Sequence, residues 1–273
     1  MKNTLRIFFI ALAFLSLGAL AQTSEVRTVD KFTSIANSTS GNIYLKQGSP
    51  QRVELEGKPA TIASIETEVS GGKLKIRVKS HNGTWSWFHD DELKIRITAE
   101  NIDGIEINGS GDLTAVNKLS GSNLIINLNG SGNLAAEIGL TGTLEANVAG
   151  SGDINVKGQF QNLKGKVSGS GDLQLSAAVA NQSEFDISGS GEIKVLGKAQ
   201  SLLGSVNGSG DLDAANFEVD KCSVRVSGSG NAEVFAKTEL EARTSGSGDI
   251  SYRGTPAKLS THNSGSGSIN KAQ

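Results

Sequence analysis

Apolar and polar residues alternate along most of the chain, in short runs that recur with a period of about 20 residues. Each period is centred on a Gly-Ser-Gly triplet. One apolar residue stands two positions before the first glycine, and another stands four positions after it. Alternation at a period of two is typical of β-strands with one buried face. The pattern therefore predicts a strand, a sharp turn and another strand in every copy.

Nine copies follow one another, at spacings of 18 to 21 residues. Self-similarity at such a period is typical of solenoids and other repeat folds. A further apolar group in each period, such as Leu119 followed by Leu124, predicts a third short strand. We therefore expect an all-β protein, a right-handed parallel β-helix (solenoid) of about 20-residue coils with Gly-Ser-Gly corners. The triplets begin at Gly109, Gly130, Gly150, Gly169, Gly189, Gly208, Gly228, Gly246 and Gly265.

In a β-helix no single coil buries its apolar face, but stacked coils share one core and pair their backbones along the axis. The corner glycines are expected to supply positive φ, and the nine serines, Ser110 to Ser266, to form a ladder of hydroxyl groups. The competing fold is an antiparallel sheet or sandwich in which the period is a hairpin. Only the alignment of the corners into one ladder separates the two folds.

Three segments are expected from the chain as a whole. Residues 1–21 carry two basic residues, an apolar stretch and a final Ala-Leu-Ala, which is the pattern of a secretory signal peptide. Residues 22–108 are expected to form irregular N-terminal coils of the β-helix, and residues 109–273 the regular nine-copy repeat. No apolar run in the mature chain approaches the roughly 20 residues that span a bilayer, so no membrane span is expected there.

Composition narrows the function further. Removal of residues 1–21 takes the net charge from −2 to −4, and basic residues are not clustered, so nucleic-acid binding is not expected. Cys222 is the only cysteine, which leaves no disulfide framework. The 34 glycines and three prolines favour strands and tight turns, and stability must come from packing and backbone pairing.

The residue after each triplet is acidic in six of the nine copies, as in Asp112 and Asp153. Stacked carboxylates can collect Ca²⁺. Alternatively, each Asp or Asn bonds its own turn and faces solvent, which we favour, because the Gly-Gly-x-Gly-x-Asp motif of calcium-binding repeats is absent. No metal site is therefore expected.

One loop departs from the repeat. Residues 81–91 lie between two alternating segments and contain both tryptophans of the chain. Trp85, Trp87 and Phe88 are the candidate ligand-binding residues, since exposed rings on a loop can stack on sugars or anchor a protein. The alternative is a hydrophobic lid over the N-terminal end of the core. His81, His89 and Asp90 have no recognised metal-ligand spacing.

No catalytic residues are expected. His262 stands in the last copy, Cys222 has no histidine near it in sequence, and the serines belong to the corners. Neither a cofactor nor an enzymatic activity is therefore predicted. The runner-up is a polysaccharide-binding or polysaccharide-cleaving β-helix protein, since paired acids on such a surface can cleave glycans.

The signal peptide, the strand-rich opening Phe32 to Leu55 and the Gly-Ser-Gly-Asp-Leu copies from Gly109 onward resemble the putative auto-transporter adhesin, head GIN domain family. The resemblance covers nearly all of the mature chain. It implies an exported β-helical envelope or cell-surface protein of Gram-negative bacteria, in the periplasm, on the surface or outside the cell. The implied function is non-catalytic, either adhesion or a structural scaffold, with a protein or glycan partner. It supplies no functional residues, and self-transport is not expected.

Overall fold

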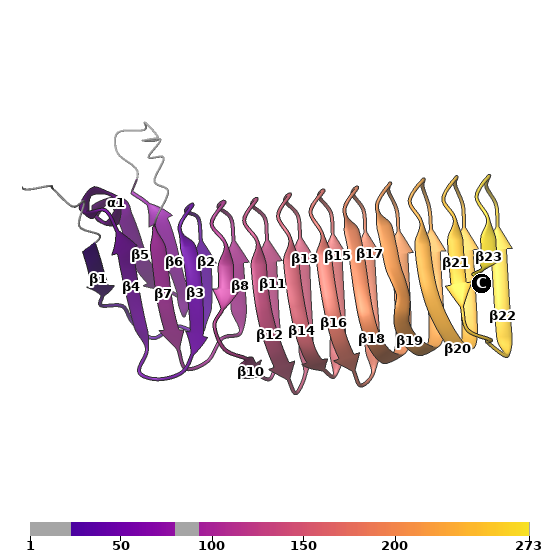
Figure 1. The fold of residues 1–273 in the computed structure, drawn as a ribbon, viewed down its shortest axis with the longest axis horizontal. Helices are drawn as coiled ribbons and strands as arrows, with labels where there is room; N and C mark the ends of the chain where they lie inside the picture. The colour runs from indigo at the N-terminus through magenta and orange to yellow at the C-terminus, as the bar shows by residue number, and fades with distance from the viewer. Residues whose placement is uncertain (1–22, 80–92, 273) are drawn as a thin grey trace, which may run out of the picture.

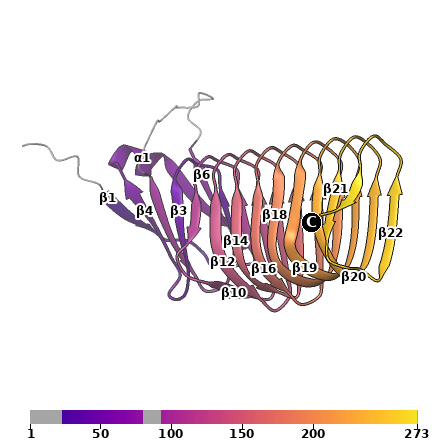
Figure 2. The ribbon, with the colours of Figure 1, turned by 45° about the vertical axis from the view of Figure 1, so that its right-hand side comes forward.

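The computed structural model describes residues 23–79 and 93–272. The chain winds into a flattened solenoid whose coils stack along one axis (Figures 1 and 2). Strands that follow the corners form one long sheet, face 1, and strands that precede the corners form the opposite sheet, face 2. From residue 104 onward neighbouring coils pair in parallel, with Ile154 opposite Leu173 of the next coil, for example. The expected all-β parallel β-helix is confirmed, and the competing antiparallel sandwich is excluded.

Each face adds its strands in a fixed spatial order. Face 1 runs through β1 (Thr23–Arg27), β4 (Arg52–Gly57), β7 (Lys94–Ala99), β3 (Asn42–Gln47), β9 (Leu113–Ala115), β12 (Leu134–Leu140), β14 (Ile154–Phe160), β16 (Leu173–Val179), the first parts of β18 (Glu192–Val206), β19 (Asp211–Val226) and β20 (Ala232–Thr244), then β21 (Ile250–Arg253) and β23 (Ile269–Lys271). Face 2 runs through β5 (Ile65–Ser70), β6 (Lys73–Val78), β2 (Ser34–Asn37), β8 (Gly104–Ile107), β11 (Leu124–Leu128), β13 (Thr143–Val148), β15 (Asn162–Val167), β17 (Gln182–Ile187), the second parts of β18, β19 and β20, and β22 (Lys258–Asn263).

Three strands per coil, as the sequence predicts, occur in the first regular coil, where β10 (Leu119–Gly121) lies between β9 and β11. The next coils have two strands, because the third apolar group closes the bend far from the corners. Phe160 ends β14 there, and Leu163 lies near the start of β15. In β18, β19 and β20 one strand continues around that bend.

The core fills the space between the two faces. Inward side chains alternate with outward ones, and the inward residues, from Phe32 to Ile250 along the sequence, form one continuous apolar cluster. Phe185 and Phe217 contact each other edge to face in this core, with ring centroids 6.3 Å apart. Such stacking lets each coil bury apolar surface only against its two neighbours.

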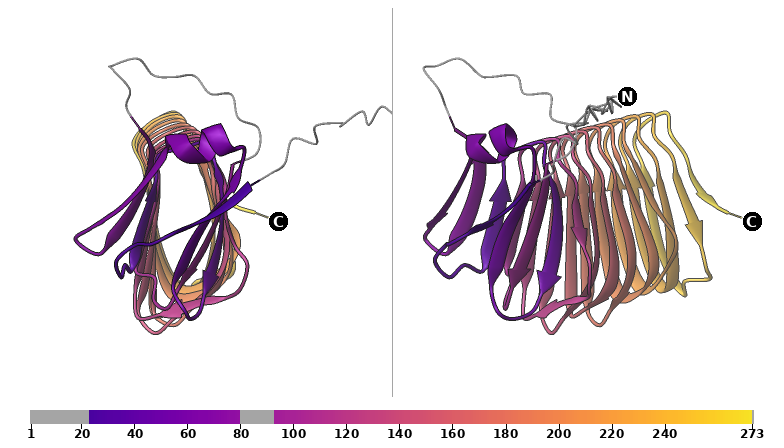
Figure 3. Two further views of the ribbon diagram at one scale, coloured as in Figure 1. Left: turned by 90° about the vertical axis from the view of Figure 1, so that its left-hand side faces the viewer. Right: turned by 60° about the vertical axis from the view of Figure 1, so that its left-hand side comes forward.

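At the N-terminal end the order in space departs from the order in sequence. Strand β2 pairs with β6 on one side and β8 on the other, so the coil of β6 and β7 stacks outside the earlier coil of β2 and β3. Three pairings here are antiparallel: β1 with β4, β4 with β7, and β5 with β6. Helix α1 (Pro59–Ser64) lies across this end, with Ile62 buried (Figure 3).

The C-terminal end is finished with polar side chains. All residues of β22 are exposed, and Thr261 and Asn263 occupy the positions that Ala242 and Thr244 fill in the coil before. Asn263 also braces its corner from within, because its amide donates to the Gly267 carbonyl and its oxygen accepts from a backbone N–H. The buried Asn37 braces the corner before β3 in the same way.

Candidate binding groove on face 1

The aromatic residues predicted to bind a ligand, Trp85, Trp87 and Phe88, lie outside the residues that the structure describes, as do His81, His89 and Asp90. They belong to the segment between β6 and β7, which are strands of opposite faces. Whether the segment is a binding tip or a lid therefore stays a prediction.

The Gly-Ser-Gly corners stack into one ladder along an edge of the solenoid, as expected. The Ser151 N–H donates to the Gly130 carbonyl of the preceding coil at 3.1 Å, and equivalent bonds continue to the last corner. The reason for glycine differs from the expected one, because no corner glycine has a positive φ. A Cβ atom on Gly130 would lie 1.9 Å from the Gly109 carbonyl oxygen, so glycine is required by the close approach of the coils.

The expected hydroxyl ladder is not formed. Within residues 23–79 and 93–272, no hydrogen bond involves the hydroxyl group of a corner serine, and the ladder runs through the backbone instead.

A second ladder begins directly after the corners, and it explains the Asp and Asn residues there. The Asp112 carboxylate accepts a hydrogen bond from the Asn133 N–H at 2.8 Å, and the Asn133 amide oxygen accepts from the Asp153 N–H at 3.0 Å. Each side chain therefore caps the next coil, whereas the sequence analysis expected a bond within its own turn. In the described part of the chain, no group of His, Cys, Asp or Glu side chains is arranged to hold a metal ion.

Glu192 interrupts this second ladder. Its longer side chain accepts no hydrogen bond from the Asp211 N–H, although the two residues are paired in register. Burial raises the pKa of Glu192, nearby Lys194 opposes that rise, and the carboxylates of neighbouring coils, such as Asp172, add to it.

A shallow groove of about 390 Å³ runs across four coils of face 1, beside the second ladder. Asp112, Asn133 and Asp153 form one wall. The outward residues of the strands form the floor, where the small exposed side chain of Ala135 leaves the depression. These outward floor residues are Thr114, Ala135, Asn155 and Gln174, and they lie over the backbone of Leu113 and Leu134.

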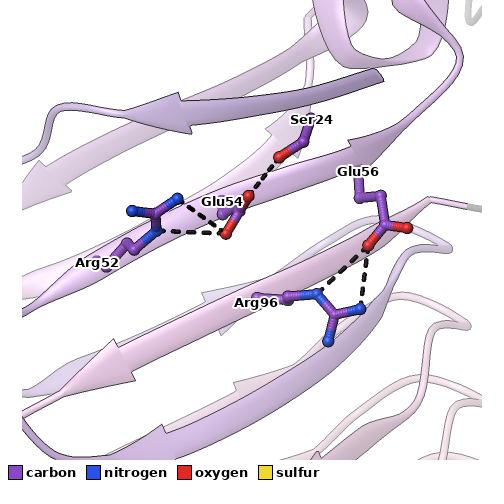
Figure 4. A network of polar contacts seen from close by, with 5 residues as sticks. All are labelled: Ser24, Arg52, Glu54, Glu56 and Arg96. Carbon is purple, nitrogen blue, oxygen red and sulfur yellow. Dashed lines mark hydrogen bonds and ion pairs between the residues drawn. The ribbon is translucent and has the colours of Figure 1, made fainter. Parts of the chain in front are cut away.

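Tyr44 extends the floor of the groove toward the N-terminal end, because it pairs in register with Thr114. The Arg96 guanidinium lies over the Tyr44 ring, 5.5 Å from its centroid, and also donates to Glu56 at 3.1 Å. Figure 4 shows the Arg96–Glu56 pair beside a second group, in which Glu54 accepts hydrogen bonds from Ser24 and Arg52. The charge of Arg96 is thus partly compensated by Glu56.

The charge of Arg52, on the strand next to Arg96, is compensated by Glu54 in the same manner. The hydrogen bond from the Ser24 hydroxyl lowers the pKa of Glu54 most, burial opposes it, and Arg52 and Arg96 lower the pKa further. These groups therefore leave this end of face 1 without a strong excess of positive charge.

Face 2 has grooves of a different kind. One of about 390 Å³ lies around Gly104 and the exposed Ile125, and smaller ones follow the column of Glu145, Lys164 and Glu184. Charges of opposite sign alternate from coil to coil in this column, and Lys164 and Glu184 are 3.8 Å apart. Such charges compensate one another within the protein.

Cys222 and His262, which the sequence analysis considered as catalytic residues, have opposite surroundings. Cys222 is buried in the core, and burial raises the pKa of its thiol to about 12, so the thiol stays protonated. His262 is exposed on β22 at the far end of the solenoid.

The sequence analysis did not identify Tyr44, Thr114, Ala135, Asn155 or Gln174. Each occupies an ordinary outward position of an alternating strand, and the five are brought together only by the stacking of coils. The signal that could have found them is the small size of Ala135 between two larger polar residues of neighbouring coils.

A family model for the putative auto-transporter adhesin, head GIN domain, matches residues 31–196 and 178–256. The chain belongs to this family. The expected resemblance is thereby confirmed, and the matched residues of the head GIN domain include every residue of the groove. No curated protein matches the chain.

Several solved structures share the fold of this head GIN domain protein. A putative adhesin from Parabacteroides merdae is 18% identical, with a TM-score of 0.69 and coverage of 92% of this chain and 96% of its own. A putative lipid binding protein from Parabacteroides distasonis is 24% identical, with a TM-score of 0.67 and coverage of 92% and 97%. A putative adhesin from the same species is 23% identical, with a TM-score of 0.64 and coverage of 93% and 98%.

Proposed function

We propose that this chain is a non-catalytic binding domain of an exported envelope or cell-surface protein of a Gram-negative bacterium, with a role in adhesion or as a structural scaffold. Membership of an adhesin-like family supports this proposal, as does the pattern of a signal peptide in residues 1–21. In the described residues, no helix is long and apolar enough to cross a membrane. The partner would contact the outward side chains of the solenoid, which repeat from coil to coil.

The proposal that the domain is non-catalytic rests on the hydrogen bonds that the acidic residues of the face 1 groove already make. Asp112 and Asp153 are the two carboxylates that line it, and each already accepts a backbone N–H from the next coil. They stand two coils apart, or about 10 Å at the usual strand spacing. Glycosidase carboxyl groups are separated by roughly 5 to 9.5 Å. The spacing of the two acids is at the upper limit of that range, and both carboxylates already accept a backbone N–H of the next coil, so we infer that they support the fold.

Trp85, Trp87 and Phe88 are included in the proposed binding surface. The segment that contains them is followed directly by β7, whose Arg96 stacks on Tyr44 at the end of the groove.

Adhesion and catalysis are tested with the same preparation. Beads coated with residues 22–273 are passed over immobilised bacterial envelopes, mucin and matrix proteins, and the fraction retained is measured. The same protein is incubated with neutral and acidic polysaccharides, and released reducing or unsaturated ends are assayed. We expect retention on at least one surface and no released ends.

Matched variants connect the result to a face. Asn155→Lys changes the groove on face 1, and Asn162→Lys makes the same change on face 2. Retention that is reduced by only one of these variants supports the proposal and identifies the face. Release of ends that disappears in Asp153→Asn, or the absence of retention on every surface, would overturn the proposal.

A further inference from the structure

Five outward side chains of face 1 stand in one straight column along the solenoid axis. Tyr44 pairs with Thr114, Thr114 with Ala135, Ala135 with Asn155, and Asn155 with Gln174. The column covers four coil steps, or about 19 Å at the usual spacing of paired strands. The groove therefore presents one chemical group per coil to any molecule that lies along the axis.

We propose that this column binds an extended neutral glycan, with the sugar chain parallel to the solenoid axis. The proposal rests on the binding function proposed above and specifies its ligand class and site. In this arrangement the face of the Tyr44 ring that Arg96 does not cover supplies a stacking surface for a sugar ring, and Thr114 and Ala135 leave room for the next units. Asn155 and Gln174 bond the hydroxyl groups of the last units.

The two amides are available for such a ligand. Within the described chain, the side chains of Asn155 and Gln174 make a single hydrogen bond, in which the Asn155 amide donates to the Gln174 amide oxygen at the long distance of 3.5 Å. The Asn residues of the adjacent ladder differ, since Asn133 already caps a backbone N–H and also donates to Asp112. An exposed amide has donors and an acceptor, which suits hydroxyl groups that also donate and accept.

The charges around the column favour an uncharged ligand. Asp112 and Asp153 form its wall. At the two ends of the column, Arg96 is paired with Glu56 and Lys194 with Asp213. Lys157, two residues after Asn155 on the same face, lies in register with the acidic Glu137 of the adjacent coil. A polyanionic glycan or an anionic membrane would meet these carboxylates without a free cation in the groove to offset the repulsion. A neutral polyhydroxyl chain carries no such penalty.

The position of the groove also argues against an added peptide strand. Peptides extend a sheet by bonding to an unpaired strand edge. Strands β9, β12 and β14 are paired on both sides, so their backbones offer no free edge. The surface must therefore be recognised through its side chains. An extended pyranose chain suits such recognition, because it advances by nearly one coil spacing per sugar unit.

The experiment measures binding of residues 22–273 to neutral oligosaccharides by isothermal titration calorimetry. The probes are gluco-, manno- and xylo-oligosaccharides, each from dimer to octamer. We expect one series to bind, with an affinity that increases with length and reaches a plateau near the pentamer, since five coils contribute to the column. Polygalacturonate and vesicles of anionic phospholipid serve as the charged probes, and we expect weaker binding to both.

Two pairs of variants locate the site. Ala135→Ile fills the depression and should weaken binding at least about tenfold, which corresponds to about 1.4 kcal/mol. Ala178→Ile makes the same change elsewhere on the outer surface of face 1, on β16, and should leave binding unchanged. Tyr44→Leu should weaken binding to a similar extent, whereas Tyr44→Phe should bind as the unchanged protein does, because the ring is retained. Thermal melts establish that all four variants are folded.

The inference and the proposed function can fail separately. If coated beads are retained on a surface but neutral oligosaccharides neither bind nor release them, the glycan is wrong and the adhesion function stands. Equal binding by Ala135→Ile and Ala178→Ile, or preferential binding of an anionic probe, would also overturn the inference. If beads are retained on no surface, the proposed function fails as well.

Discussion

Replacement of one corner glycine by alanine tests the physical basis of the solenoid. In Gly130→Ala the new Cβ would lie 1.9 Å from the Gly109 carbonyl oxygen, whereas ordinary contacts begin at 3.4 Å. The two coils must therefore separate by roughly 1.5 Å at this edge. That shift breaks the bonds that the N–H groups of Gly130, Ser131 and Gly132 donate to the preceding coil, at 3.2 to 3.4 Å.

The expected cost follows from these three bonds. At about 1 kcal/mol each, their loss lowers the free energy of unfolding by about 3 kcal/mol. Ser131→Ala is the matched control, because the hydroxyl it removes makes no hydrogen bond, and a change of less than about 0.5 kcal/mol is expected. Gly71→Ala separates the role of φ, since Gly71 has a φ of 59° and open space around it. It should cost about 1 to 2 kcal/mol.

Urea denaturation followed by far-ultraviolet circular dichroism measures the three variants under identical conditions. If Gly130→Ala loses less than about 1 kcal/mol, or no more than Ser131→Ala, the explanation from close coil contact is wrong.

Three further predictions concern single side chains. The pKa of Glu192 is raised in the folded state, so its protonated form favours folding. The free energy of unfolding should therefore fall as the pH rises from below 4.5 through the raised value. In Glu192→Gln, urea denaturation across that range should show a smaller fall. Asn37→Ala should cost about 2 to 3 kcal/mol in the same assay, because it leaves buried backbone groups unpaired, while Asn263→Ala in the exposed last coil should cost under about 1; equal losses would contradict the difference in burial. The Cys222 thiol should resist alkylation by iodoacetamide at mildly alkaline pH until the protein is unfolded, since burial raises its pKa to about 12; rapid labelling of the native protein would refute this.

The regular coils could be predicted from sequence because their signal is local and repeated. Alternation fixed the inward positions, and the triplets marked the corners that the structure stacks into one ladder. The role of the glycines was predicted for the wrong reason, because a close approach between residues about 20 positions apart leaves no trace within one corner. The same applies to the Asp and Asn ladder, whose acceptors and donors lie in different coils.

The N-terminal arrangement and the groove could not be derived in this way. A strand such as β2 carries an ordinary alternating pattern, and nothing in it specifies that β6 and β8 are its neighbours. Pairing partners of parallel strands are chosen by the packing of the whole stack. For the same reason the sequence drew attention to Trp85 and Trp87, which stand out from the repeat, and passed over Tyr44, which lies within a normal strand.

The direction of the inter-coil hydrogen bonds has a mechanical consequence. These bonds run along the solenoid axis, so a tensile force along that axis loads the last interface first and peels coils away singly. Detachment of one coil of about 20 residues lengthens the chain by about 60 Å, since extended residues span about 3.3 Å each and a stacked coil only about 4.8 Å. Peeling should begin in the coil formed by β22 and β23, where all the side chains of β22 are exposed. Under sustained load the domain would yield in small, equal steps and so act as an extensible tether.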